Sequence, residues 1–409
     1  MTTTYQTLAV HGGPAALSGL PALPPWPQHG PEEEHGLLEV LRSGAWGSIH
    51  GEVVRTFEGE LAAFQGAQHA IALTNGTLAL AAALRALDVG VGDEVIVPPY
   101  TFIATATAAL FVGAVPVFAD VDPATHLLDA AAVEAAVTER TRAVIPVHLG
   151  GDVVDMTALN EVACRHDLAV VEDCAQALGA RWEGRGVGTL GDLGTFSFQT
   201  SKNITAGEGG AITAQDERLA TSTYAQVNVG RLPRGAWYEH SVVGYNLRLT
   251  EFQAAVLRAQ LQRLPDLQRV RAERAAALRE ALTPLEGVEV AARDERVTAH
   301  GHHLFLFRVP ELGSRGLRDA AARALTAEGV PGVSTGYVPL HHNEAIRSEM
   351  HRLTERLGQP APVPDCPATD LVASDTLWLP QSVLLASEEH IAAIGQAIAK
   401  VVANPDALA

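Results

Sequence analysis

The chain is poor in cysteine, in positive charge and in long apolar runs, and each shortage excludes a class of protein. Its three cysteines, Cys164, Cys174 and Cys366, lack the paired spacing of a zinc site or a disulfide framework. The net charge of −18 at pH 7 excludes the basic surface with which proteins bind nucleic acids. No apolar run reaches the length of a membrane span, and residues 1–13 lack the basic and apolar regions of a signal peptide. We therefore expect a cytoplasmic protein that binds neither nucleic acid nor membrane.

What the chain does have is apolar sequence in a regular order. Of its 409 residues, 47% are hydrophobic and 19% are charged, as in folded globular proteins. Short apolar segments typical of strands alternate with segments of helical periodicity. The strand segments are residues 70–73, 94–97, 115–119, 143–147, 168–171, 194–198 and 210–213, and the helical ones are 78–87, 104–112, 130–137 and 156–166. This order predicts an α/β fold with a mainly parallel seven-stranded sheet covered by helices.

The sequence on either side of the predicted sheet divides the chain into three regions. Residues 1–30 are rich in proline and glycine and predict an extended N-terminal arm. The large domain then covers residues 31–255. A long helix, residues 251–282, leads into residues 256–409, for which we predict a smaller C-terminal α+β domain. Its expected elements are strands at 287–290 and 304–309 and helices at 316–328 and 388–402.

Lys202 is the most informative residue of the chain. It lies between the strand segment 194–198 and a glycine-rich turn, and Asp173 closes the preceding strand segment. Because ligands of parallel α/β folds bind at the carboxyl ends of the strands, we expect these two side chains in one site. A lysine that can form a Schiff base, with a carboxylate that can hold a pyridinium nitrogen, predicts catalysis with pyridoxal phosphate (PLP). A lysine on a loop is, taken alone, usually a solvated surface residue.

Residues 74–78 follow the first strand and open a helix. Gly76 lets the backbone approach an anion closely, and the N–H groups of Gly76 and Thr77 at the helix start are suited to a phosphate. An ordinary helix N-cap explains the same residues, since Asn and Thr are common there.

Two further residues suit a flat heteroaromatic ligand. Phe102 follows two prolines at the end of a strand and is placed to cover one face of a ring. Gln176 lies three residues after Asp173, where its side chain can hydrogen-bond near the phenolic oxygen of the cofactor.

The histidines do not predict a metal site. His148 closes the strand segment 143–147, and we assign it to the wall of the pocket rather than the role of a general base. His300, His302 and His303 are close together in sequence, but no strand or helix period puts all three on one face with a carboxylate.

These motifs together resemble the DegT-type family of PLP aminotransferases, the sugar and cyclitol branch of the aspartate-aminotransferase fold. The resemblance covers essentially the whole chain and implies PLP fold type I with PLP as the cofactor. It rests on six stretches in the family's order and spacing, residues 74–77, 98–102, 146–149, 172–177, 196–210 and 244–253.

The resemblance assigns a role to each site residue. It implies that Lys202 carries the cofactor covalently and that Asp173 partners the pyridinium nitrogen. The asparagine that matches Asn246 reaches the phosphate of the neighbouring subunit in similar enzymes, so a homodimer with shared sites is expected. Members that dehydrate in place of transaminating have histidine where this chain has Lys202. The remaining cofactor contacts implied are the stacking residue Phe102, the ring contact Gln176 and the phosphate ligands Gly76, Thr77 and Ser197.

The substrate is also indicated by resemblance. Residues 25–27, 44–47 and 366–380 resemble the ketocyclitol aminotransferases and the 3-amino-5-hydroxybenzoate synthases more than enzymes that act on nucleotide-linked ketosugars. Trp46, Tyr337 and His341 are the candidate substrate residues.

The resulting hypothesis is an aminotransferase that moves an amino group from L-glutamine or L-glutamate to a keto-cyclitol or keto-sugar in antibiotic or other secondary-metabolite biosynthesis. Dehydration and aromatisation, as in the benzoate synthases, and amination of a nucleotide-linked ketosugar stay open as alternatives. A PLP-bound regulatory or scaffold protein without turnover is a third, against which the intact pair of Lys202 and Asp173 argues.

Overall fold

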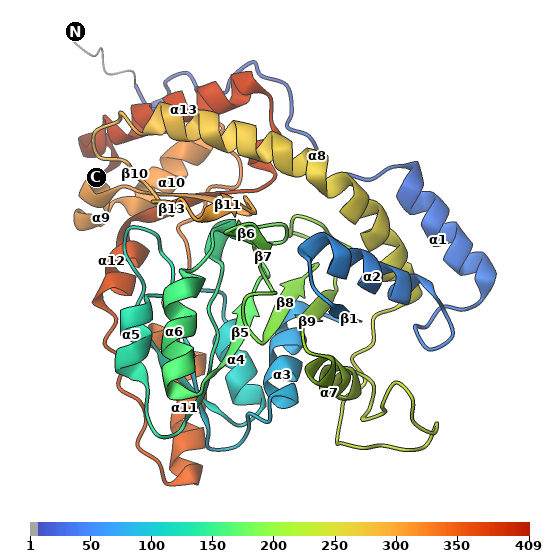
Figure 1. Ribbon diagram of the computed structural model, residues 1–409. Coiled ribbons are helices and arrows are strands. Elements are labelled where there is room, and N and C mark those ends of the chain that lie inside the picture. Colours follow the sequence, from blue (N-terminus) through green and yellow to red (C-terminus); the bar gives the residue numbers. More distant parts are fainter. Residues whose placement is uncertain (1–6) are drawn as a thin grey trace.

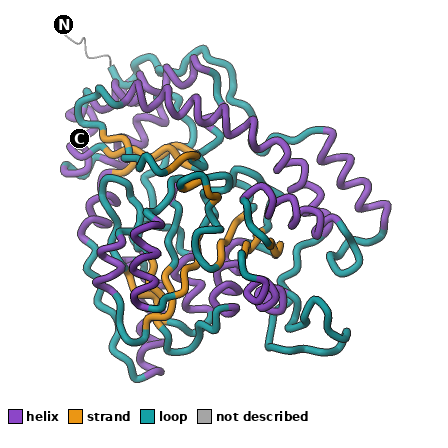
Figure 2. The backbone as a smooth tube through the Cα atoms, in the orientation of Figure 1, coloured by secondary structure: helices purple, strands orange, loops and turns teal. Residues whose placement is uncertain are grey.

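A seven-stranded sheet with helices on both faces forms the larger part of the computed structural model, which describes residues 7–409 (Figures 1 and 2). The strand order is β1-β9-β8-β5-β4-β2-β3. The pairs from β3 to β8 are parallel, whereas β9 runs antiparallel to both β8 and β1. The predicted α/β fold with a mainly parallel sheet is therefore confirmed. The strands are β1 (His69–Leu73), β2 (Glu94–Val97), β3 (Val115–Phe118), β4 (Thr141–Val144), β5 (Ala169–Asp173), β8 (Leu193–Ser197) and β9 (Gly210–Ala214).

Successive residues along the strands face opposite layers of helices. In β2, Val95 and Val97 pack in one apolar cluster and Ile96 between them packs in the other. The first cluster includes α3 (Gly76–Ala86), α4 (Ala104–Phe111) and α7 (Glu217–Val227), and the second includes α2 (Val53–Gln65), α5 (Ala130–Ala136) and α6 (Met156–His166). Because both faces are covered, apolar residues on successive positions of a strand can all be buried, as Val95, Ile96 and Val97 are.

Helix α8 (Glu251–Leu282) passes from the large domain into the small one, across the top of Figure 1. It starts at a capping box between Thr250 and Gln253. Leu257 and Leu264 belong to the core of the large sheet, whereas Leu278 belongs to the core of the small domain. Because α8 contributes to both cores, the division of the chain near residue 255 stays a prediction.

The small domain packs helices on a three-stranded antiparallel sheet. Its strands, in the order β10-β12-β13, are β10 (Glu289–Val290), β12 (Leu304–Arg308) and β13 (Thr376–Pro380). The helices α10 (Arg318–Ala327) and α13 (Glu388–Val402) supply much of its apolar core. The N-terminal arm contributes Leu8 to this core, and α1 (Pro31–Ser43), which follows the arm, packs on α8. Among the helices of residues 7–409, none combines the length and apolar character needed to cross a membrane.

Several elements were not expected from the sequence. These are α7 and β13, the helices α9 (Pro310–Ser314), α11 (Glu344–Leu357) and α12 (Pro367–Asp375), and a second three-stranded sheet made of β6 (Arg181–Trp182), β7 (Arg185–Gly186) and β11 (Val297–Ala299).

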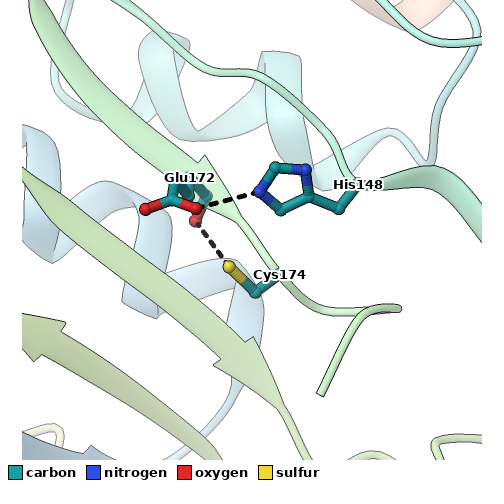
Figure 3. Close-up of side chains that lie close together, drawn as sticks. All are labelled: His148, Glu172 and Cys174. Atoms are coloured by element: carbon teal, nitrogen blue, oxygen red, sulfur yellow. Dashed lines mark hydrogen bonds and ion pairs between the residues drawn. The ribbon is translucent and has the colours of Figure 1, made fainter. Parts of the chain in front are cut away.

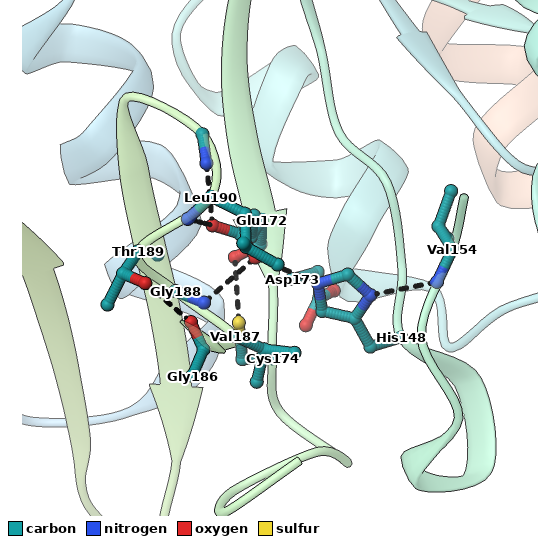
Figure 4. Close-up of polar contacts among 12 residues, drawn as sticks. His148, Val154, Glu172, Asp173, Cys174, Gly186, Val187, Gly188, Thr189 and Leu190 are labelled. Carbon is teal, nitrogen blue, oxygen red and sulfur yellow. Dashed lines mark hydrogen bonds and ion pairs between the residues drawn. The ribbon is translucent and has the colours of Figure 1, made fainter. Parts of the chain in front are cut away.

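A fully buried carboxylate fixes the carboxyl end of β5. Glu172 accepts hydrogen bonds from the backbone N–H groups of Gly188, Leu190 and Gly191 at 2.7–2.8 Å, and from His148 Nε2 at 3.0 Å (Figure 4). Four donors compensate the buried charge, which is costly without partners. The neighbouring loop, residues 186–191, is thereby tied to the strand that delivers Asp173.

Candidate active site

A cavity of about 770 Å³ opens at the carboxyl ends of β5 and β8. It is lined by the start of α3, the segment before α4, the residues after β5 and β8, and two side chains that follow in the chain beyond α8. Eight of the eleven residues singled out by the sequence line this one cavity, namely Gly76, Thr77, Phe102, Asp173, Gln176, Ser197, Lys202 and Tyr337.

Asp173 is the buried acid of the cavity. Its carboxylate accepts hydrogen bonds from the Thr105 hydroxyl at 3.0 Å and from the Ala175 N–H at 3.1 Å. Burial raises the pKa of Asp173, and these two donors and Lys202 oppose that rise. Thr105 lies in the first turn of α4 and was missed by the sequence reasoning, because nothing in its local pattern marks it as a contact of Asp173.

Lys202 lies on the connection between β8 and β9. These two strands are antiparallel, so their connection starts and ends at the edge of the sheet where Asp173 lies. Burial lowers the pKa of Lys202 to about 8, although Asp173 opposes this shift. Within residues 7–409 no hydrogen bond or ion pair involves Lys202 Nζ. The amine is therefore more often neutral near pH 8 than that of an ordinary lysine, and a neutral amine is the nucleophile that attacks a carbonyl.

The start of α3 forms a cradle for an anion. Asn75 caps the helix by accepting from the Leu78 N–H at 2.9 Å, whereas the N–H groups of Gly76 and Thr77 have no acceptor within residues 7–409. A Cβ on Gly76 would lie 2.7 Å from the Cβ of Ser197, so a side chain there would close the space between the helix start and β8. Free N–H groups at a helix N-terminus are a typical phosphate site.

Gln176 and Tyr337 are linked side by side on the wall of the cavity. Gln176 Oε1 accepts from the Gly150 N–H at 2.7 Å, and Gln176 Nε2 donates to the Tyr337 hydroxyl at 2.9 Å. Burial raises the pKa of Tyr337 to about 12, so its hydroxyl stays protonated at neutral pH. Phe102, whose ring centroid lies 6.5 Å from that of Tyr337, is 56% exposed and offers an open aromatic face.

Three predicted site residues do not line this cavity. Asn246 is exposed and pairs as an isolated bridge with Asn228. Trp46 packs against Phe252 at the surface, with 52% of its area exposed. His341 hydrogen-bonds Asp370 at 3.0 Å and lines a separate hollow. Their proposed roles stay predictions.

His148 corrects one sequence-based assignment, because it is fully buried and is not part of the cavity wall. The Val154 N–H donates to Nδ1, which leaves the proton on Nε2, the atom that donates to Glu172 (Figures 3 and 4). Val147, the residue before it, lines the cavity instead. Cys174, also shown in Figure 3, is buried and bonds the Glu172 carbonyl oxygen through its thiol. His148 therefore fixes structure beneath the site.

Comparison with known proteins decides the family. The family model described as the DegT/DnrJ/EryC1/StrS aminotransferase family matches residues 27–399. The chain belongs to this family. It is a PLP-dependent aminotransferase, as its relatives are. The predicted fold type I and PLP cofactor are thereby confirmed.

Individual relatives are similar over nearly their whole length. The chain is 41% identical to the 3-amino-5-hydroxybenzoate synthase of Amycolatopsis mediterranei, over 94% of this chain and 98% of the relative. It is 39% identical to a putative L-glutamine:3-amino-2,3-dideoxy-scyllo-inosose aminotransferase of Streptoalloteichus tenebrarius, over 98% and 99% of the two chains. A crystal structure of 3-amino-5-hydroxybenzoic acid synthase superposes with a TM-score of 0.86 at 39% identity, and covers 94% of this chain and 99% of that one.

The described residues of the cavity fit the cofactor that the family uses. PLP has a phosphate, a ring nitrogen that needs an acid partner, a flat ring and an aldehyde. The helix start at Gly76 suits the phosphate, and the Asp173 carboxylate suits the ring nitrogen. The open face of Phe102 suits the flat ring, and the half-buried amine of Lys202 suits the aldehyde.

The Gly76 cradle predicts the effect of adding one methyl group. In Gly76→Ala the new Cβ collides with Ser197, so we expect PLP to bind about 10-fold to 100-fold more weakly while the chain stays folded. Titration of the apoprotein with PLP, followed by visible absorbance, measures this. Gly59→Ala is the matched control, because a Cβ on Gly59 meets nothing within 4 Å. Equal PLP affinity in Gly76→Ala and wild type would remove Gly76 from the phosphate site.

Proposed function

We propose that this aminotransferase moves an amino group from L-glutamine or L-glutamate to the ketone of a keto-cyclitol or keto-sugar. The reaction would belong to the biosynthesis of an aminocyclitol-type antibiotic or a similar secondary metabolite, in the cytoplasm. The observation that carries the acceptor class is the charge of the cavity. Of the described residues that line it, Lys202 is the one basic side chain apart from His303, and the acids are Asp173 and Glu208. The described lining of this cavity thus offers no arginine, and no lysine besides Lys202, to the diphosphate of a nucleotide-linked sugar.

The names of relatives support the same acceptor class. Those from Streptoalloteichus tenebrarius and Micromonospora echinospora, 39% and 38% identical, are named as putative L-glutamine-dependent aminotransferases of a scyllo-inosose derivative. The 41% identity to a 3-amino-5-hydroxybenzoate synthase favours dehydration with aromatisation as the second candidate. The two candidate reactions differ in product, because only dehydration with aromatisation yields an aromatic ring.

We assign the cofactor contacts to the residues that line the cavity. Bound PLP supplies an electron sink through which an amino group passes from an amino acid to a ketone. The N–H groups of Gly76 and Thr77 and the Ser197 hydroxyl hold its phosphate, and Phe102 packs on its ring. Gln176 contacts the ring edge and, with Tyr337, forms the wall on which the substrate lies.

The two catalytic residues hold and move protons. The Asp173 carboxylate holds the proton of the ring nitrogen, and the hydrogen bonds from Thr105 and Ala175 keep that carboxylate in place. Lys202 Nζ holds the cofactor covalently. When its amine is free, Lys202 Nζ would act as the base that moves a proton between carbon atoms of the substrate and the bound cofactor, because burial lowers the pKa of Lys202 to about 8.

We further propose a homodimer in which Asn246 completes the phosphate site of the partner subunit. The loop between α7 and α8 projects from the body of the subunit in Figure 1. Asn246 lies near the end of this loop, five residues before α8 begins. Apolar side chains on this loop are exposed, among them Tyr238 (85%) and Val243 (82%). A second copy of the chain that covers this loop would remove these side chains from water.

The proposed reaction is tested with purified holoenzyme, an amino donor and a polyhydroxy cyclohexanone. We expect a ring amine, detected by mass spectrometry, with L-glutamine or L-glutamate as donor. Lys202→Arg should abolish turnover, because a guanidinium does not attack the cofactor aldehyde. Lys400→Arg is the matched control, since Lys400 is the only other lysine of the chain and pairs with Glu328 far from the cavity. An aromatic product would favour the benzoate-synthase reaction, and amination of nucleotide-linked sugars alone would overturn the acceptor class.

The shared site is tested by mixing two inactive variants. Lys202→Ala lacks the lysine, and in Asn246→Asp a negative charge faces the proposed phosphate site. If Asn246 serves the partner, each heterodimer has one site with both defects and one with neither, so random mixing should restore about a quarter of wild-type activity. Continued inactivity of the mixture, when co-purification of differently tagged subunits shows that heterodimers form, would place Asn246 in its own subunit. A monomeric protein at micromolar concentration would contradict the dimer itself.

A further inference from the structure

His303 is the one histidine that lines the active-site cavity. It comes from the segment before β12, and the cofactor contacts assigned above do not use it. Its side chain is 6% exposed, and burial, with Lys202 adding to the effect, holds the pKa of His303 well below its usual range. At neutral pH it is therefore a neutral imidazole with one N–H and one free lone pair.

Asn203, the residue after Lys202, decides which ring nitrogen carries the proton. Its side chain is buried, and Asn203 Nδ2 donates to the Gly301 carbonyl at 2.6 Å. This bond orients the amide so that Asn203 Oδ1 faces His303 Nδ1 at 3.0 Å. Because the amide oxygen only accepts, His303 Nδ1 must carry the hydrogen. Nε2 keeps its lone pair, and no residue of 7–409 makes a hydrogen bond to it.

The backbone around His303 is held as firmly as its ring. The His303 N–H donates to the Gly150 carbonyl at 2.8 Å, and the Gly301 N–H donates to Gly151 at 2.7 Å. His302 has a φ of +52°, which is rare for a residue other than glycine. Strain of this kind persists only where surrounding contacts impose it, and it is common at functional sites.

We propose that His303 is a substrate-binding residue whose Nε2 accepts a hydrogen bond from a hydroxyl of the acceptor ring, and that Asn203 is the positioning residue that fixes its tautomer. The inference rests on the proposed function, because the amino donor lacks such a ring hydroxyl. The uncharged Nε2 atom, as a hydrogen-bond acceptor, selects substrates that have a hydroxyl at one ring position. A substrate analogue without that hydroxyl would leave Nε2 unpaired in a partly dry cavity.

The test separates the two half-reactions of the holoenzyme. In His303→Phe we expect the half-reaction with the amino donor, followed by the visible absorbance of the cofactor, to stay within about 3-fold of wild type. With the acceptor ketone we expect kcat/KM to fall about 10-fold to 100-fold, mainly through KM, because a bond to bound substrate is lost. His302→Asn is the matched control, since it changes the neighbouring histidine, keeps a residue that tolerates positive φ and should leave both half-reactions unchanged.

A set of cyclohexanone polyols that each lack one hydroxyl identifies the contact. With wild-type enzyme, kcat/KM for one of these analogues should be about 10-fold to 100-fold lower than for the fully hydroxylated ketone. With His303→Phe, kcat/KM for the same analogue should be almost equal to that for the fully hydroxylated ketone. Asn203→Leu should reproduce part of the acceptor defect, because it removes both the oxygen that accepts from Nδ1 and the amide that donates to Gly301. Thermal unfolding of each variant shows whether the fold is kept, and the ¹⁵N chemical shifts of labelled His303 in the folded apoprotein report the Nδ1–H tautomer independently of activity.

Two results overturn the inference. If His303→Phe slows the donor half-reaction as much as the acceptor half-reaction, His303 acts on Lys202 or the cofactor and not on the acceptor. If removal of each hydroxyl lowers kcat/KM by the same factor in wild type and in His303→Phe, Nε2 binds no ring hydroxyl. Failure of the proposed function is distinguishable, because wild type itself would then turn over no cyclic polyol ketone, and the assignment of His303 would fall with it.

Discussion

The constraint on which the rest of the structure depends is the meeting of a buried carboxylate and a half-buried amine at one edge of the sheet. Asp173 ends a parallel strand, and Lys202 lies on the connection of an antiparallel pair, and the strand order β5-β8-β9 brings both to the same edge. Burial raises the pKa of the acid and lowers that of the amine, and their mutual attraction opposes both shifts. For Lys202 this shift matters to the chemistry, because an ordinary lysine, with a pKa of about 10.4, is almost wholly protonated near neutral pH.

Much of the surrounding structure serves to hold this pair in place. Directly before Asp173, the fully buried Glu172 is fixed by three backbone N–H groups and His148, so the end of β5 cannot shift without breaking a charged network. Directly after Lys202, the Asn203 side chain hydrogen-bonds the Gly301 carbonyl and the His303 ring. Asn203 thereby connects the Lys202 segment to the cavity wall that carries His303. Asp173 and Lys202 therefore each adjoin a buried polar side chain that anchors them to neighbouring loops.

The sequence predicted the sheet well because its strands are buried on both faces and contain short apolar runs, such as residues 95–97 of β2. Helices Met156–His166 and Glu251–Leu282 were predicted with their observed ends, and in the structure Asp155 and Thr250 cap their first turns. The site was reached through Lys202 and Asp173 because each follows a strand. Contacts such as those of Thr105 with Asp173 and of Asn203 with His303 join residues 68 and 100 positions apart, and no local pattern contains them. His148 was assigned to the cavity wall for a similar reason. Its position after a strand gives the direction of the chain, but not the side of the sheet on which its ring packs.

The measurement that tests this account most directly is the titration of Lys202 in the apoprotein. The chain contains two lysines, Lys202 and Lys400, so ¹³C-labelled lysine gives two side-chain signals that Lys400→Arg assigns. The account predicts that the Lys202 signal titrates near pH 8, and that Asp173→Asn moves the midpoint to lower pH, because the variant removes the charge that favours the protonated amine. A midpoint close to the ordinary value of about 10.4, or one that Asp173→Asn leaves unchanged, would contradict the claim that burial and Asp173 together set the reactivity of Lys202.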